Sequence, residues 1–165
     1  MRNQASKCEG FTLLEILIVI SIIGTLSIVG VTSYSGFNQS KALEIESQEF
    51  VQILDLAKKR AFSNDKAGCG SLDHYSITID TENSVDYDLT AVCEGGSINQ
   101  TLSYHLDSAV IFQQYQSAES RFNPNSSGAT SNCIIVKHSK LNQCQQVSVN
   151  SLGLIEIEDS EDCQC

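Results

Sequence analysis

Residues 10–31 read GFTLLEILIVISIIGTLSIVGV, an apolar run that contains a single carboxylate, Glu15. A short charged leader, MRNQASKCEG, precedes the run and carries Arg2 and Lys7. As a helix, residues 11–31 would measure about 30 Å, which matches the hydrocarbon core of a bilayer. We therefore predict a transmembrane helix over 11–31. A charge inside such a helix is costly and usually serves a function, so Glu15 is a candidate functional residue.

The distribution of basic residues predicts the orientation of this span. Arg2 and Lys7 precede it, and no Lys or Arg follows until Lys41. Positive charge stays on the cytoplasmic side, so we expect a single pass of the inner membrane with a periplasmic or extracellular head. A cleaved secretory signal would end in small residues, whereas TSYSGFNQS follows the run. A simple uncleaved anchor would explain the length but neither Glu15 nor the Gly-Phe junction before it.

The six residues GFTLLE, 10–15, resemble the processing site of type IV prepilins and type II secretion pseudopilins. The resemblance implies that a prepilin peptidase cleaves between Gly10 and Phe11 and that the new amino group of Phe11 is methylated. It also implies that Glu15 pairs with the Phe11 amino group of a neighbouring subunit, which would set the axial register. The alternative is that Glu15 is an acid tolerated near the membrane interface.

The same resemblance implies the partners and the location. The partners would be other pilin or pseudopilin subunits, the prepilin peptidase, an inner-membrane assembly platform and membrane lipid. The subunit would leave the membrane for a pilus or pseudopilus. The sequence holds no GxSxG, P-loop or HExxH motif, so we expect no enzyme activity and no cofactor.

Composition bounds the function of the remaining chain. The 165 residues carry a formal net charge of -10, and a chain without the leader would be more negative because Arg2, Lys7 and Glu9 leave together. Nonspecific nucleic-acid binding depends on Lys and Arg, so we expect no nucleic-acid partner. The tightest basic cluster, residues 58–60, is better explained as the last turn of a helix, where the helix dipole favours cations.

Six cysteines follow the predicted span, and an even number outside the cytoplasm suggests disulfides. The candidates are Cys69, Cys93, Cys133, Cys144, Cys163 and Cys165. Six cysteines allow 15 connectivities. Cys69 and Cys93 bracket one expected hairpin and Cys133 and Cys144 another, while Cys163 and Cys165 could pair with each other or tie the tail elsewhere.

A metal site is the alternative use of these side chains. No CxxC pair exists and the three histidines are scattered, so we expect no zinc. Two groups of acids, residues 80–88 and 156–162, could hold calcium, but neither matches an EF-hand loop and we interpret both as solvated surface.

The anchor helix is expected to continue over residues 32–64. Beyond 41 its apolar positions recur at helical spacing, which predicts a buried stripe. The stripe consists of Leu43, Phe50, Leu54, Ala57 and Ala61. Residues 33–40 are polar and contain Gly36, which makes them the weakest part of the helix.

Short alternating segments after residue 65 predict a β-sheet onto which this stripe packs. We expect strands over 75–80, 85–91, 102–106, 109–112, 134–137, 145–149 and 154–157, with a polar loop over 113–131. A helix followed by strands indicates an α+β protein with an antiparallel sheet. The arrangement, and the ending QQVSVNSLGLIEIE, are similar to the minor pseudopilin H and FimT group.

The expected organisation is a leader over 1–10, a membrane and filament-core helix over 11–31, its periplasmic continuation over 32–64, and a disulfide-containing head over 65–165. The favoured function is that of a structural subunit of a type IV pilus or type II secretion filament. Two alternatives stay open: a filament-borne adhesin or ligand-binding module that uses loop 113–131, and a simple membrane-anchored extracellular protein.

Overall fold

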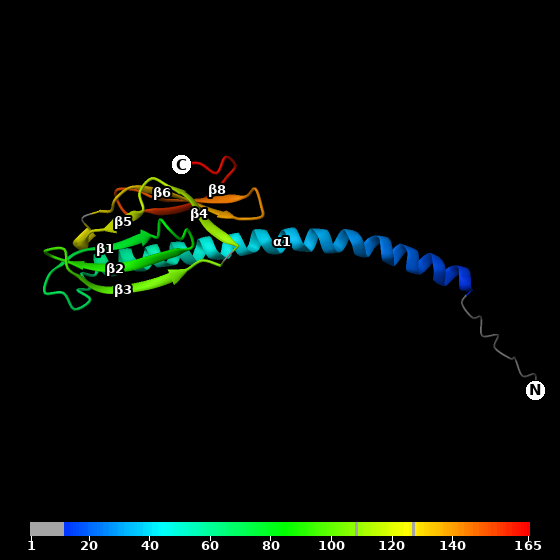
Figure 1. The fold of residues 1–165 in the computed structure, drawn as a ribbon, viewed down its shortest axis with the longest axis horizontal. Helices are drawn as coiled ribbons and strands as arrows, with labels where there is room; N and C mark the ends of the chain where they lie inside the picture. Colours follow the sequence, from blue (N-terminus) through cyan, green and yellow to red (C-terminus); the bar gives the residue numbers. More distant parts are fainter. Residues whose placement is uncertain (1–11, 108, 127) are drawn as a thin grey trace, which may run out of the picture. The chain divides into compact units, whose positions relative to one another are not determined.

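The computed structural model describes residues 12–107, 109–126 and 128–165, and gives the backbone alone for 28–35. Its first element is α1, Leu13–Phe62, a helix of 50 residues (Figure 1). The chain divides into two compact units, Met1–Asn38 and Gln39–Cys165. The division falls inside the polar stretch 33–40, through which the α1 backbone continues. The two units are described separately below.

The second unit contains eight strands in two four-stranded antiparallel sheets. The first sheet has the order β3-β2-β1-β5 and the second β4-β6-β7-β8. The strands are β1 Leu72–Ile79, β2 Asp86–Cys93, β3 Ile98–His105, β4 Val110–Tyr115, β5 Glu119–Phe122, β6 Asn132–His138, β7 Cys144–Val149 and β8 Ile155–Ser160. The predicted α+β class is confirmed, with two sheets where we expected one.

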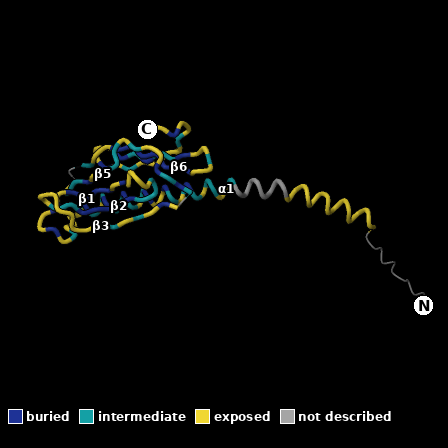
Figure 2. Tube along the Cα trace, in the orientation of Figure 1, coloured by how far each residue is buried: buried dark blue, intermediate teal, exposed yellow. Residues whose placement is uncertain are grey.

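The predicted stripe of α1 forms the helix side of the core. Leu43, Phe50, Leu54, Ala57 and Ala61 are all buried, as expected from their spacing. Ser47 is also fully buried and fills the gap between Leu43 and Phe50, although its hydroxyl is polar. Figure 2 shows this burial as dark blue and teal along the part of α1 inside the head. The stripe therefore packs on the strands, as an amphipathic helix does on a sheet.

Aromatic side chains join the helix to both sheets. The Phe50 ring lies 5.1 Å from the Tyr87 ring of β2 and 5.0 Å from the Phe112 ring of β4, both in edge-to-face geometry. Tyr87 in turn stacks on Tyr104 of β3 at 5.4 Å. Burial raises the pKa of Tyr87, and the nearby carboxylates Glu46 and Glu49 raise it further. Tyr87 is therefore neutral at every physiological pH and acts as a packing group.

The expectation of a loop over 113–131 was wrong. The segment contains the end of β4, the strand β5 and a short 3-10 helix, Pro124–Ser126. β5 pairs with β1 from Thr78↔Glu119 to Tyr75↔Phe122. It was missed because its inward positions are Ser120 and Phe122, so hydropathy shows only one apolar residue. The buried Ser120 hydroxyl accepts a hydrogen bond from Asn132 Nδ2 at 2.8 Å, which offsets the cost of its burial.

Candidate functional site: the N-terminal helix and the stapled head

The start of α1 is capped by Thr12. The Thr12 Oγ1 and main-chain oxygens accept hydrogen bonds from the Glu15 backbone N–H at 3.2 and 3.1 Å. Thr12 and Glu15 thus have the spacing of a capping box, with the acid in the first helical turn. Sequence reasoning missed this structural role of Glu15, although the T-x-x-E pattern was available. This capping role adds to the proposed assembly role, because a fixed first turn sets the position of Glu15 along the helix axis.

Gly10 and Phe11, the expected processing and methylation residues, lie outside the described residues. Glu15 is described and is exposed on the helix surface. No described residue forms an ion pair with Glu15 in the single chain.

The first unit presents apolar side chains on every side of the helix. Leu13 is 84% exposed, and each large apolar residue from there to Leu26 is also exposed. An unbroken apolar surface of this kind marks a contact with protein or lipid. Among the described residues, no helix reaches the length and hydropathy required of a membrane span. The predicted span over 11–31 includes Phe11 and residues 28–31, whose side chains are not described.

Hydroxyl groups in the same stretch are satisfied by the helix itself. Ser21 Oγ donates to the Leu17 carbonyl at 2.8 Å, and Ser27 Oγ donates to the Ile23 carbonyl at 2.8 Å. Thr25 makes an equivalent bond within its own turn. Because these bonds are internal, the polar side chains do not require water, which suits an apolar environment.

Three disulfides tie the head. Cys69 is joined to Cys93, the pair that the hairpin spacing favoured. The suggested pairing of Cys133 with Cys144 is not the one in the structure. The bonds there are Cys133–Cys165 and Cys144–Cys163, so the C-terminal tail is joined to both β6 and β7.

The two C-terminal disulfides cover one face of the second sheet. Cys133 and Ile135 alternate in β6 with Ile134 and Val136, which belong to the main core. On the opposite face Ile135, Cys144 and Cys163 form a separate buried cluster. The tail therefore buries Ile135 on a face that would otherwise be open. Two covalent bonds thus hold the C-terminal tail across this face of the second sheet.

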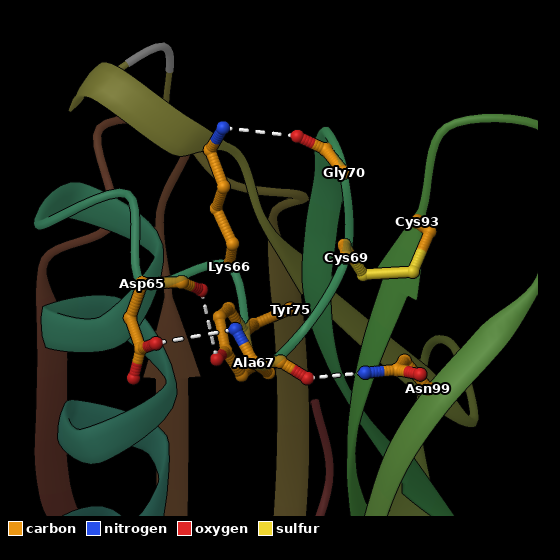
Figure 3. The surroundings of a disulfide bond; sticks show 8 residues. All are labelled: Asp65, Lys66, Ala67, Cys69, Gly70, Tyr75, Cys93 and Asn99. Carbon is orange, nitrogen blue, oxygen red and sulfur yellow. Dashed lines mark hydrogen bonds between the residues drawn. A yellow bond between two sulfur atoms is a disulfide. The ribbon is translucent and has the colours of Figure 1, made fainter.

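The remaining disulfide sits where α1 ends (Figure 3). Lys59 and Arg60 occupy the last turn of α1, as the dipole interpretation of the basic cluster predicted. Tyr75 Oη donates to the Asp65 carbonyl at 3.0 Å, and Lys66 Nζ donates to the Gly70 carbonyl at 2.9 Å. Burial is the main reason that the pKa of Tyr75 is raised, so this donor keeps its proton. The connection from helix to sheet is thus fixed by covalent and hydrogen bonds.

Two of the acids over residues 80–88, Asp80 and Asp86, have structural partners. Asp80 Oδ1 accepts from the Glu82 backbone N–H at 2.8 Å and so closes the β1–β2 turn. Asp86 accepts from Asn83 Nδ2 and contacts His105 Nδ1, both at 2.5 Å. No group of three or more metal-ligating side chains occurs among the described residues. We assign the acids of this turn to local structure.

One ion pair holds the edge of the first sheet. Arg121 Nη2 donates to Glu119 Oε2 at 2.6 Å on β5. This hydrogen bond is the main reason that the pKa of Glu119 is lowered. His74 on β1 adds a second contact, with Nε2 3.6 Å from Glu119 Oε1 and Nδ1 2.9 Å from Asp73 Oδ2. Of these contacts, only the approach of His74 Nε2 to Glu119 Oε1 joins β1 to β5, and the other two lie within one strand.

The described chain consists of a capped apolar helix that leads into a disulfide-tied β head. Comparison with known proteins found a family match at the N-terminus and a structural likeness over most of the chain. Residues 5–31 match the family described as the prokaryotic N-terminal methylation motif. No curated protein matches the chain in sequence.

Among solved structures the chain is similar to the minor pseudopilin EpsH from the type 2 secretion system of Vibrio cholerae. The TM-score is 0.55 at 12% identity, and the alignment covers 71% of this chain and 96% of that one. At this identity the likeness concerns the fold. Together, the methylation motif and the pseudopilin-like fold support a pilin or pseudopilin subunit of a type IV pilus or type II secretion filament.

Proposed function

We propose that this protein is a minor pilin or pseudopilin, matured at its N-terminus and built into a type IV pilus or type II secretion filament through α1. The observation that carries the proposal is the methylation motif over residues 5–31, joined to a helix whose apolar side chains are exposed from Leu13 to Leu26. Such a surface needs a continuous apolar partner, which lipid provides before assembly and neighbouring helices provide after it.

Maturation is proposed to occur between Gly10 and Phe11 on the cytoplasmic side, followed by methylation of the Phe11 amino group. Before assembly the chain would cross the inner membrane once through residues 11–31, with the head outside. The assembly platform and membrane lipid are proposed partners at this stage. The acidic head, with no basic patch beyond the end of α1, gives no support to a nucleic-acid partner.

Glu15 is proposed to set the register of assembly. Its side chain is exposed, its backbone is fixed by the Thr12 cap, and it follows the proposed new N-terminus by four residues. A buried carboxylate in an apolar bundle is costly unless it is paired. Pairing with the Phe11 amino group of a neighbour would remove that cost only at the correct axial position.

No part of the described head suggests catalysis, and we propose a structural role alone. A hollow of about 400 Å³ beside β2 and β3 is lined by carboxylates, Ser103 and His105. The His105 ring contacts Asp86, and no hydrogen bond joins Ser103 to His105 among the described residues, so the pair lacks the contact of an activated nucleophile.

The test is mass spectrometry of the full chain extracted from the membranes of a host with an active prepilin peptidase. We expect a protein that lacks residues 1–10 and carries one methyl group on Phe11. A Cys8→Ser variant serves as a control that should be processed equally, since Cys8 belongs to the removed leader. An intact N-terminus, or cleavage after the apolar run, would contradict the proposal.

A further inference from the structure

A groove of about 720 Å³ lies along β8 in the second unit. One wall is the part of α1 around Leu43 and Glu44, and the floor is the start of β7 at Cys144 and Gln145. The other wall is the end of β8 and the residue after it, Ile157 to Glu161. All of these residues belong to one compact unit.

The β8 wall is the edge of a sheet. β8 is last in the order β4-β6-β7-β8 and pairs with β7 alone among the described strands. Five consecutive residues, 157 to 161, line the groove, and side chains of alternate residues point to opposite faces. The groove lining thus includes residues of both faces of β8, and on its outer side β8 has no partner among the described strands, so main-chain N–H and C=O groups there lack a ladder.

The chemistry of the walls selects the kind of strand that would fit. Carboxylates from Glu44, Glu158, Asp159 and Glu161 line the groove, and no Lys or Arg belongs to the lining. Glu44 contacts Lys41 on its own helix, and Asp159 accepts from Gln145 Nε2 at 2.9 Å. Ile157, which is 36% exposed, adds an apolar position between the acids. A complementary strand would alternate basic and apolar or neutral side chains.

We propose that the β8 edge is a docking site for an extended, Lys- or Arg-bearing segment of another protein, which adds as a strand beside β8. Main-chain hydrogen bonds would supply affinity, and the acids would select basic side chains. The inference goes beyond the filament role and does not depend on it, since it concerns the head alone.

A second copy of this chain is a poor occupant. Its described basic residues lie on a helix, in turns, on an interior strand or in an ion pair, and none lies on a strand edge without a partner. They are Lys41, Lys58, Lys59 and Arg60 on α1, Lys66 bound to Gly70, Arg121 bound to Glu119, Lys137 on the interior strand β6, and Lys140 in the β6–β7 turn. The partner is therefore a different protein.

The test measures binding of a synthetic eight-residue peptide, with Lys alternating with Val, to the full chain in detergent by isothermal titration calorimetry. We expect Glu158→Lys to weaken binding at least tenfold. Glu82→Lys is the matched control, because it makes the same charge change at an exposed acid in the β1–β2 turn, away from β8 and outside the groove lining, and should change affinity less than threefold. Circular dichroism verifies that both variants are folded.

A second arm separates strand addition from simple charge attraction. The same peptide with N-methylated backbone amides keeps its charge but cannot donate to the β8 edge, and we expect at least tenfold weaker binding. A peptide with Glu in place of Lys should not bind. Absence of binding by the Lys peptide, equal loss in the two variants, or equal affinity of the N-methylated peptide would each overturn the proposal.

Discussion

Phe50 is the residue through which α1 contacts both sheets. Its ring is fully buried and meets Tyr87 on the first sheet and Phe112 on the second. Each aromatic contact of this geometry contributes beyond the burial of area. The three rings therefore connect α1 to both sheets. Loss of the Phe50 ring leaves a cavity that borders α1 and both sheets.

Replacement of Phe50 by Ala is expected to destabilise the head by about 3–5 kcal/mol, because a large buried ring is removed and a cavity remains. Gln52→Ala, at an exposed position one helical turn away or less, should change stability by less than about 0.5 kcal/mol. Urea unfolding of the full chain in detergent, followed by tyrosine fluorescence, measures both. Similar urea midpoints for the two variants would show that Phe50 does not pack tightly between α1 and the two sheets.

The Glu119–Arg121 pair predicts a pH dependence at the same scale. The hydrogen bond from Arg121 holds the pKa of Glu119 in the folded state below its ordinary value. A depressed folded pKa contributes stability that is present above the unfolded pKa and lost as pH falls through the folded one. Arg121→Gln should therefore reduce stability near neutral pH, and the difference from the original protein should shrink below about pH 4.

Unfolding midpoints measured across pH 3 to 7 check this expectation (the range follows from the ordinary carboxylate pKa, about 4.3). Lys140→Gln removes an exposed positive charge from a turn and is the matched control, with a small difference that does not vary with pH in the same way. An Arg121→Gln effect that is constant across the range would contradict the ion-pair account.

At the scale of elements, the long helix and most strands were predictable, because their apolar residues follow a period of 3.6 or 2. The stripe from Leu43 to Ala61 shows this for α1. The strand β5 was not predictable, since its inward Ser120 is buried by virtue of a hydrogen bond with Asn132, a residue 12 positions later. The pairing of the two C-terminal disulfides was likewise beyond the sequence, because it depends on the tail returning over β6 and β7.

The two C-terminal disulfides are expected to be non-additive. They are nested, with Cys144–Cys163 inside Cys133–Cys165, so either bond alone keeps the tail over Ile135. We expect the double loss, by Cys→Ser at all four positions, to exceed the sum of the two single losses. Each disulfide in a loop of this size contributes about 2–4 kcal/mol when it is the only constraint.

The Cys69–Cys93 bond closes a separate loop and provides the comparison. Its removal, combined with removal of one C-terminal bond, should give additive losses because the two share no loop. Urea unfolding of the fully oxidised variants measures the series. If the stability losses of the two C-terminal disulfides simply added, the two bonds would not hold the tail in place of one another.

Gly128 connects the two sheets at the backbone. It has φ +97°, and a Cβ built there would lie 2.6 Å from the Ser151 carbonyl oxygen. That oxygen already accepts from the Ala129 N–H at 3.0 Å. Gly128→Ala should therefore cost more than about 1 kcal/mol, from both strain and crowding.

Gly95→Ala separates these two causes. Gly95 also has a positive φ, +91°, but nothing lies within 4 Å of a Cβ there. We expect a smaller loss that reflects strain alone. Thermal unfolding of the two variants gives the comparison, and a Gly95→Ala loss equal to that of Gly128→Ala would remove the role assigned to the Ser151 contact.

At the scale of the whole molecule, the chain joins a helix that cannot satisfy its apolar surface alone to a head that is complete in itself. The head has a closed core and three disulfides. The first unit has exposed apolar side chains and one carboxylate, Glu15, without an ion-pair partner among the described residues. This division supports the proposed assembly through the helix.

The helix is the part of the candidate site that sequence predicted best, because the residues that carry it are consecutive. GFTLLE needs no folding to be recognised, and the apolar run after it needs only helical geometry. The β8 groove was not predictable, since its walls are α1 and a strand more than 100 residues later, brought together only by the fold.

The central claim is that Glu15 aligns subunits in a filament. The most direct measurement is the amount of full-length Glu15→Val protein in filaments sheared from cells, compared with Glu49→Val, which removes an exposed acid from the head part of α1. We predict that both variants are processed at residue 10, that Glu49→Val enters filaments normally, and that Glu15→Val stays in the membrane. Normal amounts of Glu15→Val in sheared filaments would contradict the account.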